Sequence, residues 1–251
     1  MLLEIKNVFK QVTEPSGEII TVSHAEHLML DKGGQMLLTG PSGSGKTTLL
    51  HMIAGLLSPS GGEIYFDGAR IDNMPEKERD LWRARNIGYV FQKLNLIEAL
   101  TAEENILLAG YFAGGNMAEL KKRAAMLLER VGLANKKDTL PGKLSIGEQQ
   151  RIAVVRAVIN KPVLLLADEP TASLDAENSR IVLGLLRGLC SENGTALILS
   201  THDESVKEQF DEWFDIKGGR CTSNFNIQVG ISFPRLASRR ICSGSGARLP
   251  V

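Results

Sequence analysis

The sequence predicts an α/β fold, in which buried parallel strands alternate with helices. Four short apolar runs have the length and composition of strands that are buried on both faces, at residues 35–39, 87–91, 163–167 and 196–200. Longer segments with helical periodicity separate these runs. With 251 residues and 43% hydrophobic content, the chain can bury one large core, so we expect it to fold by itself.

Before and between these runs, three segments have the pattern of an antiparallel sheet. Residues 3–12 and 19–30 read as two strands joined by the turn EPSG at residues 14–17. Residues 63–68, with the sequence EIYFDG, add another strand and turn. The sequence therefore predicts an antiparallel β subdomain beside the α/β core.

A helical pattern dominates between about residues 93 and 160. One apolar stripe in this stretch follows the spacing i, i+4, i+7, i+8 and i+11, at Leu120, Ala124, Leu127, Leu128 and Val131. We therefore expect an inserted α-helical lobe between these limits.

The charge is balanced overall but not along the chain. Lys and Arg together number 29, as do Asp and Glu, so the net charge gives no general attraction to nucleic acid and we expect no nucleic-acid partner. From residue 220 onward there are five arginines and no acidic residue. We therefore expect a main domain at residues 1–219 and a basic appendage at residues 220–251. This appendage is either a flexible tail or a contact to a partner or to lipid headgroups.

Two other classes of protein are disfavoured. Cys190, Cys221 and Cys242 are widely spaced and odd in number, which argues against a disulfide framework or a zinc site and favours a reducing compartment. No apolar run approaches the ~20 residues that a membrane-spanning helix needs, and the amino terminus lacks the pattern of a secretory signal. We therefore expect a protein that is neither secreted nor membrane-spanning.

The strongest local motif is GPSGSGKT at residues 40–47, which matches G-x-x-x-x-G-K-[ST] between a predicted strand and a predicted helix. Its glycines let consecutive N–H groups surround phosphate oxygens, and the following helix directs its positive end at the same charge. Lys46 would neutralise the β- and γ-phosphates, and the hydroxyl of Thr47 would ligate Mg²⁺. The strand–loop–helix context disfavours the alternative, a chance glycine-rich turn. The residues predicted to bind nucleotide are Gly40, Pro41, Ser42, Gly43, Ser44, Gly45, Lys46, Thr47 and Thr48.

Two carboxylates, Asp168 and Glu169, follow the apolar run at residues 163–167. The carboxyl ends of parallel strands are where α/β sheets place ligands. Asp168 would support Mg²⁺, while Glu169, whose side chain points the other way because strand neighbours alternate, could polarise an attacking water. The alternative is a simple helix-start turn, which the neighbouring phosphate-loop motif disfavours.

Five further motifs follow the phosphate loop along the chain. After the phosphate loop come FQ at residues 91–92, LSIGEQ at 144–149, Asp168-Glu169, SLD at 173–175 and STHD at 200–203. In this order and spacing, residues 2–219 resemble the ATP-binding-cassette (ABC) ATPases. Residues 147–151 and 166–175 look most like the lipoprotein-release and macrolide-export branch of that family.

The resemblance implies an ATP-binding and ATP-hydrolysing transporter subunit that uses ATP and Mg²⁺. Such a subunit lies on the cytoplasmic face of the inner or plasma membrane, peripheral to it, and drives a separate integral membrane permease. Two subunits, which we expect to be a homodimer, would close around two ATP molecules and separate after hydrolysis. The alternative is a nucleotide-gated regulatory protein, in which ATP binding rather than turnover is the signal.

The resemblance also assigns roles to single residues. Gln92 would touch Mg²⁺ or water and report the nucleotide state to the permease. Ser145 and Gly147 would face the γ-phosphate held by the opposite subunit, and His202 would contact the γ-phosphate of its own. Each has a structural alternative: Gln92 as a surface residue, His202 as a strand-end histidine, and Ser145 as the cap of a capping box with Glu148.

Two positions depart from the family pattern. Val12 stands where the family usually has an aromatic residue that stacks on adenine, and Phe9 lies three residues earlier. We therefore expect base stacking to be reduced or supplied by Phe9. Ile146 replaces a glycine in the signature, which we expect to be tolerated because the phosphate contacts use Ser145 and Gly147.

Overall fold

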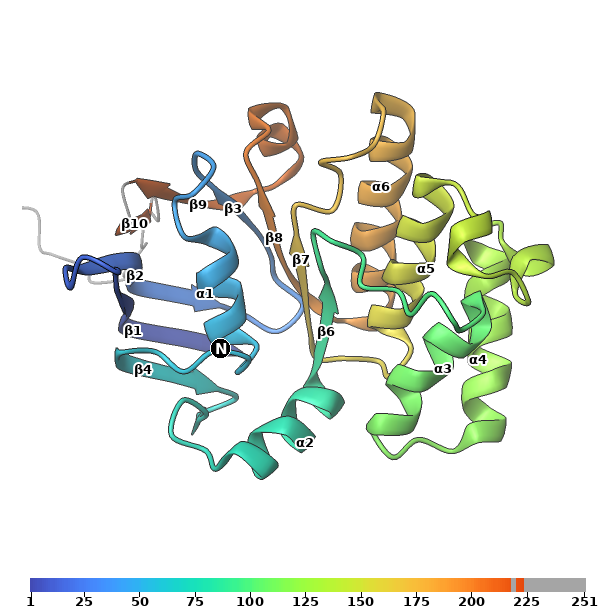
Figure 1. The fold of residues 1–251 in the computed structure, drawn as a ribbon, viewed down its shortest axis with the longest axis horizontal. Helices are drawn as coiled ribbons and strands as arrows, with labels where there is room; N and C mark the ends of the chain where they lie inside the picture. Colours follow the sequence, from blue (N-terminus) through green and yellow to red (C-terminus); the bar gives the residue numbers. More distant parts are fainter. Residues whose placement is uncertain (218–219, 224–251) are drawn as a thin grey trace, which may run out of the picture.

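One mixed sheet runs through the molecule in the computed structural model, which describes residues 1–217 and 220–223 (Figure 1). The described residues form ten strands in the order β5-β4-β1-β2-β10-β9-β3-β8-β7-β6. The strands are β1 (Leu3–Thr13), β2 (Ile19–Leu30), β3 (Gln35–Thr39), β4 (Gly61–Phe66), β5 (Ala69–Arg70), β6 (Ile87–Val90), β7 (Leu164–Asp168), β8 (Ala196–Thr201), β9 (Glu212–Lys217) and β10 (Arg220–Ser223). The helices are α1 (Lys46–Ile53), α2 (Glu76–Asn86), α3 (Ala102–Phe112), α4 (Met117–Arg130), α5 (Ile146–Val158) and α6 (Ala176–Asn193). Short 3₁₀ turns lie at Ala134–Lys136, Pro141–Lys143 and Glu204–Gln209.

The parallel part of the sheet contains all four strands that the apolar runs predict. Strands β9, β3, β8, β7 and β6 lie side by side and point in the same direction. Strand β7 begins and ends one residue later than predicted, so Asp168 is its last residue rather than the first residue beyond it. The predicted α/β core is therefore confirmed, and its carboxyl ends share one edge.

The predicted antiparallel subdomain is also confirmed. Strand β1 pairs with β2 on one side and with β4 on the other, and both pairings are antiparallel. The turn between β1 and β2 closes where predicted, since the N–H of Gly17 donates to the carbonyl of Glu14 at 2.8 Å. Between β4 and β5, Asp67 and Gly68 have φ angles of 49° and 80°, as a two-residue type I′ hairpin requires.

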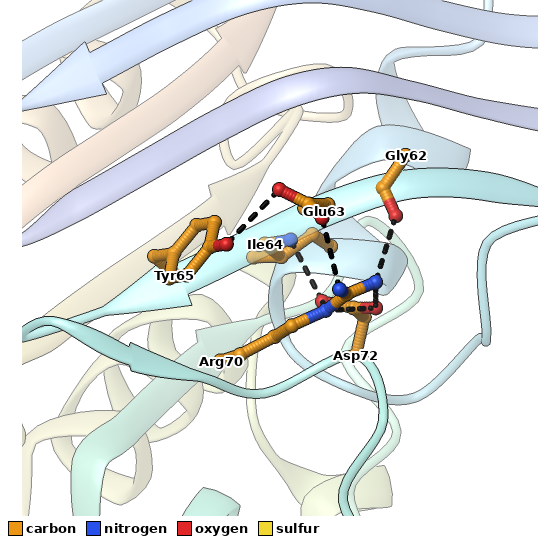
Figure 2. Close-up of polar contacts among 6 residues, drawn as sticks. All are labelled: Gly62, Glu63, Ile64, Tyr65, Arg70 and Asp72. Carbon is orange, nitrogen blue, oxygen red and sulfur yellow. Dashed lines mark hydrogen bonds and ion pairs between the residues drawn. The ribbon is translucent and has the colours of Figure 1, made fainter.

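A polar network around Arg70 holds the edge formed by β4 and β5 (Figure 2). The guanidinium of Arg70 donates to Asp72 Oδ2 and to Glu63 Oε1, both at 2.9 Å. Asp72 also accepts the backbone N–H of Ile64 at 2.8 Å, and Glu63 accepts the hydroxyl of Tyr65 at 3.0 Å. Donation to this carboxylate raises the pKa of Tyr65, so its hydroxyl stays protonated and the network is preserved.

Residues of the parallel strands alternate between two hydrophobic cores, one on each face. Leu164 and Leu166 of β7 belong to a core shared with α1, whereas Leu165 and Ala167 belong to a core shared with α3, α4, α5 and α6. This is the two-residue period of a strand that is buried on both faces. Helices α1 and α5 therefore cover opposite faces, with β7 and β8 between them (Figure 1).

The segment predicted as a helical lobe contains α3, α4 and α5. The apolar stripe lies on α4 and its carboxyl-terminal cap, and its members Leu120, Ala124, Leu127, Leu128 and Val131 are all buried. A loop without regular secondary structure, residues 91–101, leads from β6 into α3. No helix in the described part of the chain is both long enough and apolar enough to span a membrane.

Strand β10 lies where the sequence predicts the basic appendage to begin. Its residues pair antiparallel with β9, and Cys221 pairs in parallel with Ala25 of β2. Residues 220–223 are therefore part of the sheet and lie between β2 and β9, a position that the local sequence pattern does not predict. Residues 224–251 lie outside the described residues, so a basic tail there stays a prediction.

Gly88 of β6 offers a direct test of how closely α5 approaches the sheet. A Cβ atom at this position would lie 2.3 Å from the carbonyl oxygen of Ala157. We expect Gly88→Ala to lower the free energy of unfolding in urea by about 1–3 kcal/mol, because the helix must move away. The control is Gly184→Ala in α6, where nothing lies within 4 Å and alanine favours the helix. Equal losses in both variants would show that the close approach is not the cause.

Candidate functional site

At some positions of the loop between β3 and α1, the backbone has a conformation that only glycine fits. Gly40 and Gly45 have φ angles of 148° and 93°, in the region that other residues avoid. A Cβ atom at Gly40 would lie 2.6 Å from the carbonyl oxygen of Ile216, and one at Gly45 would lie 2.2 Å from that of Val22. The loop is thus pressed against β9 and β2, and it leads directly into the amino terminus of α1.

Lys46, the first residue of α1, turns its ammonium group back into this loop. The side chain is 5% exposed, and its Nζ donates to the carbonyl oxygens of Gly40 at 2.8 Å and Pro41 at 3.1 Å. The same Nζ lies 3.4 Å from Oε1 of Glu169. A buried cation is therefore held at the centre of the loop by oxygen atoms, in the way that phosphate oxygens would hold it.

The two carboxylates after β7 have different partners. Asp168 is 2% exposed and accepts the hydroxyl of Ser200 at 2.6 Å. Glu169 lies just beyond the strand with a φ of 46°, and its N–H donates to the carbonyl of Ser200 at 3.0 Å. The sequence predicts opposite directions for the two side chains because neighbours in a strand alternate. In the structure Glu169 lies beyond β7 in a left-handed backbone conformation, so alternation within the strand does not set its direction.

His202 completes a cluster with Glu169 and Lys46. Its Nδ1 lies 2.5 Å from Oε2 of Glu169, and its ring is more than half exposed. The three residues follow β8, β7 and β3 in turn, and Asp168 of β7 pairs directly with Ser200 of β8. Neighbouring parallel strands therefore bring a cation, a carboxylate and an imidazole together at one edge of the sheet.

The remaining predicted residues of this edge lie around the cluster. Gln92 is exposed and stands two residues after Val90, the last residue of β6, which pairs with Ala167 of β7. Of the phosphate-loop residues, Pro41, Ser42, Gly43 and Thr47 are exposed, Gly45 and Thr48 are partly buried, and Gly40, Ser44 and Lys46 are buried.

The loop fits a nucleotide phosphate, and the oxygen atoms near it fit Mg²⁺. Ser44 has a buried hydroxyl with no hydrogen-bond partner among the described residues, so a donor is available inside the loop. Thr47 and Asp168 offer a hydroxyl and a carboxylate, and Gln92 offers an amide oxygen. Mg²⁺ prefers such ligands and is usually held by one or two carboxylates together with substrate phosphates.

Ser145 caps helix α5, as its structural alternative predicts. Its hydroxyl accepts the N–H of Glu148 at 3.2 Å, and Glu148 Oε2 accepts the N–H of Ser145 at 2.8 Å. This hydrogen bond lowers the pKa of Glu148. Ser145 and Ile146 remain exposed, while Gly147 is buried, and a Cβ atom there would lie 2.8 Å from Asn178 Oδ1.

The structure does not bring this cap to the phosphate loop of its own chain. Helix α5 and helix α1 cover opposite faces of the sheet, and β7 and β8 lie between them (Figure 1). The cap of α5 at Ser145 and the phosphate loop are therefore on different faces of the sheet.

Phe9 and Val12 both lie on β1 but differ in their surroundings. Val12 is 40% exposed and pairs with Ile20. The ring of Phe9 packs edge-on against His24, with ring centroids 6.3 Å apart, and a Cβ atom at Gly61 would lie 2.6 Å from that ring. Phe9 is thus already engaged in packing between strands.

Sequence reasoning missed two contacts that shape the site. Ser200 binds the carboxylate of Asp168, and Asn178 closes the space above Gly147. The position of Ser200 at the end of a buried strand adjacent to β7 is a signal for the first contact. Asn178 has no such signal, because its proximity to Gly147 arises from the packing of α6 against α5.

A phosphate-binding loop after one parallel strand and a pair of carboxylates after another define a P-loop nucleotide-binding protein. The family model described as ABC transporter matches residues 24–172. The chain belongs to this family.

Individual relatives agree with this assignment. The chain is 38% identical over 230 residues to the lipoprotein-releasing system ATP-binding protein LolD 1 of Chlorobium luteolum, covering 88% of this chain and 98% of that one. It is 42% identical over 203 residues to an uncharacterized ABC transporter ATP-binding protein, Rv0986, of Mycobacterium tuberculosis, covering 80% and 82%. The predicted likeness to the lipoprotein-release branch is confirmed.

A solved structure shares the fold. It is the dimeric ATP-binding cassette MJ0796 in a post-hydrolysis state bound to ADP and Pi. Its TM-score to this chain is 0.81 and its sequence identity is 36%, over 88% of this chain and 96% of that one. The predicted ABC ATPase fold is therefore confirmed.

The close contact of the phosphate loop with β2 can be tested without nucleotide. We expect Gly45→Ala to lower the free energy of unfolding by several kcal/mol, because the added methyl group would meet the carbonyl of Val22 in an already unfavourable backbone conformation. Gly43→Ala is the matched control, since Gly43 has a φ of 78° but nothing within 4 Å. Urea unfolding of both variants measures the difference, and equal losses would assign the whole effect to the backbone angle.

Proposed function

We propose that this chain hydrolyses ATP to ADP and phosphate as the nucleotide-binding subunit of an ABC transporter. The observation that carries the proposal is the cluster in which Glu169 contacts both Lys46 and His202. A protein that only sensed ATP would need the phosphate loop, but it would not need a carboxylate held between a cation and an imidazole. The cluster therefore favours turnover over a purely regulatory role.

The phosphate loop and its neighbours would hold the nucleotide and its metal ion. Lys46 and the N–H groups of the loop would bind the β- and γ-phosphates, and Thr47, Asp168 and Gln92 would hold Mg²⁺. When bound, Mg²⁺ neutralises part of the phosphate charge. The hydrogen bond from Ser200 keeps the carboxylate of Asp168 in one orientation.

Glu169 would act as the general base. One carboxylate oxygen of Glu169 faces Lys46 and the other faces His202. As the ammonium of Lys46 turns to the phosphates, Oε1 of Glu169 becomes free to accept a proton from water. His202 would keep the carboxylate oriented through Oε2 and would present its other ring nitrogen to the γ-phosphate.

The partners follow from the relatives and from the position of α5. LolD belongs to a lipoprotein-releasing system, and the MJ0796 cassette is dimeric. We propose that this chain also forms a dimer, in which Ser145 and Gly147 of each copy serve the ATP of the other. The dimer would drive a separate permease of the same branch from the cytoplasmic face of the membrane, peripheral to it.

Glu169→Gln tests the proposed base. The amide keeps the size of the side chain but cannot take a proton, so we expect ATP binding to persist while the hydrolysis rate falls by about 10²–10⁴-fold. Phosphate release measures the rate, and size exclusion with ATP should show a more persistent dimer. Glu192→Gln, which alters an exposed carboxylate paired with Arg130, should retain the parent rate. Parent-like turnover by Glu169→Gln would remove Glu169 from this role.

Mixed dimers test whether the signature of one chain serves the other. Chains with Ser145→Arg and chains with Lys46→Ala each form inactive homodimers, but a mixed dimer can place both lesions in one site and leave the other intact. At equal amounts, about half of the dimers are mixed under random pairing, so ATP hydrolysis or nucleotide trapping should exceed that of either variant alone. No recovery by either measure, with mixed dimers confirmed by differential tags, would contradict the shared site.

A further inference from the structure

Gln92 stands at the start of a loop that has little secondary structure of its own. Residues 91–101 contain no helix or strand. Asn95 in this loop has a φ of 50°, a conformation that Asn tolerates better than most residues. A loop of this kind is held in place mainly by side chains that bind its backbone. Besides Glu104, which accepts the N–H of Thr101 in the cap of α3, two such side chains bind the loop in the described part of the chain.

The first anchor is Asn105 of α3, which is 1% exposed. Its Oδ1 accepts the N–H of Ile97 at 2.8 Å, and its Nδ2 donates to the carbonyls of Ile97 and Leu100 at 3.1 and 3.0 Å. Asn105 thus fixes the end of the loop that leads into its own helix. It lies in the same lobe and acts at the far end of the loop from Gln92.

The second anchor is Arg156, which comes from α5. Its two terminal nitrogens donate to the carbonyl oxygens of Leu94 and Asn95, each at 2.6 Å. These carbonyls lie two and three residues beyond Gln92. Burial lowers the pKa of the Arg156 guanidinium, and the two carbonyl oxygens accept its N–H groups in this partly buried position.

Helix α5 therefore makes a different contact near each end. Ser145 caps its amino terminus, and Arg156 lies eleven residues further on, about 16 Å along the helix axis. Most of the residues between them are buried, which makes the helix a rigid connection. While the two hydrogen bonds to Arg156 are intact, they transmit a displacement of Leu94 and Asn95 to α5.

We infer that Arg156 is a positioning residue that makes the Gln92 loop and the signature helix move as one body. The inference rests on the proposed function, in which Gln92 senses the nucleotide of its own chain and Ser145 serves that of the partner. Arg156 then links the two nucleotide sites of a dimer through a single helix. Its guanidinium suits this role because the planar fork binds two carbonyls at once, which the ammonium group of lysine does not reproduce.

Arg123 provides a matched control within the same lobe. It also donates to two backbone carbonyls, those of Ile159 at 2.9 Å and Val158 at 3.2 Å, and burial also lowers its pKa. Arg123, however, joins α4 to the end of α5 and does not bind the loop. Arg123→Met and Arg156→Met therefore remove the same kind of contact, with and without the connection to Gln92.

The test compares the two variants by amide hydrogen exchange and by ATP hydrolysis. In the protein without nucleotide, Arg156→Met should speed exchange in residues 93–97 at least about tenfold, and Arg123→Met should leave these amides unchanged. With the permease, Arg156→Met should keep the parent affinity for ATP, lower kcat by about tenfold or more, and reduce the Hill coefficient for ATP towards one. Arg156→Lys should fall between parent and Arg156→Met, and it replaces Arg156→Met if that variant does not fold.

Two results would overturn the inference. One is an unchanged exchange rate in residues 93–97. The other is faster exchange with the kcat and the Hill coefficient of the parent, which would make Arg156 a loop anchor without a role in coupling. Absence of ATP turnover in the parent protein would instead contradict the proposed function, whereas the exchange measurement would still report whether Arg156 holds the loop.

Discussion

The position of β7 between β6 and β8 is the constraint on which the site depends. In this parallel arrangement Asp168 is opposite Ser200, and Ala167 is opposite Val90, so residues that are far apart in the sequence end at the same edge of the sheet. The phosphate loop follows β3, the neighbour of β8 on the other side. A shift of one residue in any of these pairings would turn the strand over and move the side chain at its end to the opposite face of the sheet.

The two faces of the sheet are covered by different helices and carry different motifs. The face with α1 holds the phosphate loop, and the face with α5 and α6 holds the signature and the helices behind it. Within one chain, this separation keeps the cap of α5 at Ser145 away from the phosphate loop. The loop after Gln92 leads from β6 of the sheet into α3 of the helical lobe, so it joins the two parts of the chain.

Local patterns in the sequence predict much of this architecture. The apolar runs locate β3, β6, β7 and β8 to within a residue, because strands buried on both faces must be apolar throughout. The phosphate loop can also be predicted from the sequence, since the spacing of its glycines and lysine follows from the geometry of the phosphate that it binds. The left-handed turn at Glu169, the strand at residues 220–223 and the packing of Phe9 against Gly61 were not predictable in this way. Each depends on a neighbour that is distant in the sequence, and nothing in the local pattern identifies that neighbour. The same is true of Arg156, whose acceptors lie about sixty residues earlier.

The acceptors that Lys46 has within its own chain have a consequence for the affinity of the loop for phosphate. Its ammonium lies against the carbonyl oxygens of Gly40 and Pro41 and the carboxylate of Glu169. An arriving phosphate must displace these acceptors, and part of the binding free energy is offset by their loss. When the products leave, the same oxygen atoms recover the cation and ease its separation from phosphate. Acceptors within the chain therefore lower the affinity for phosphate relative to a lysine that has no partner, which favours release of the products after each turnover.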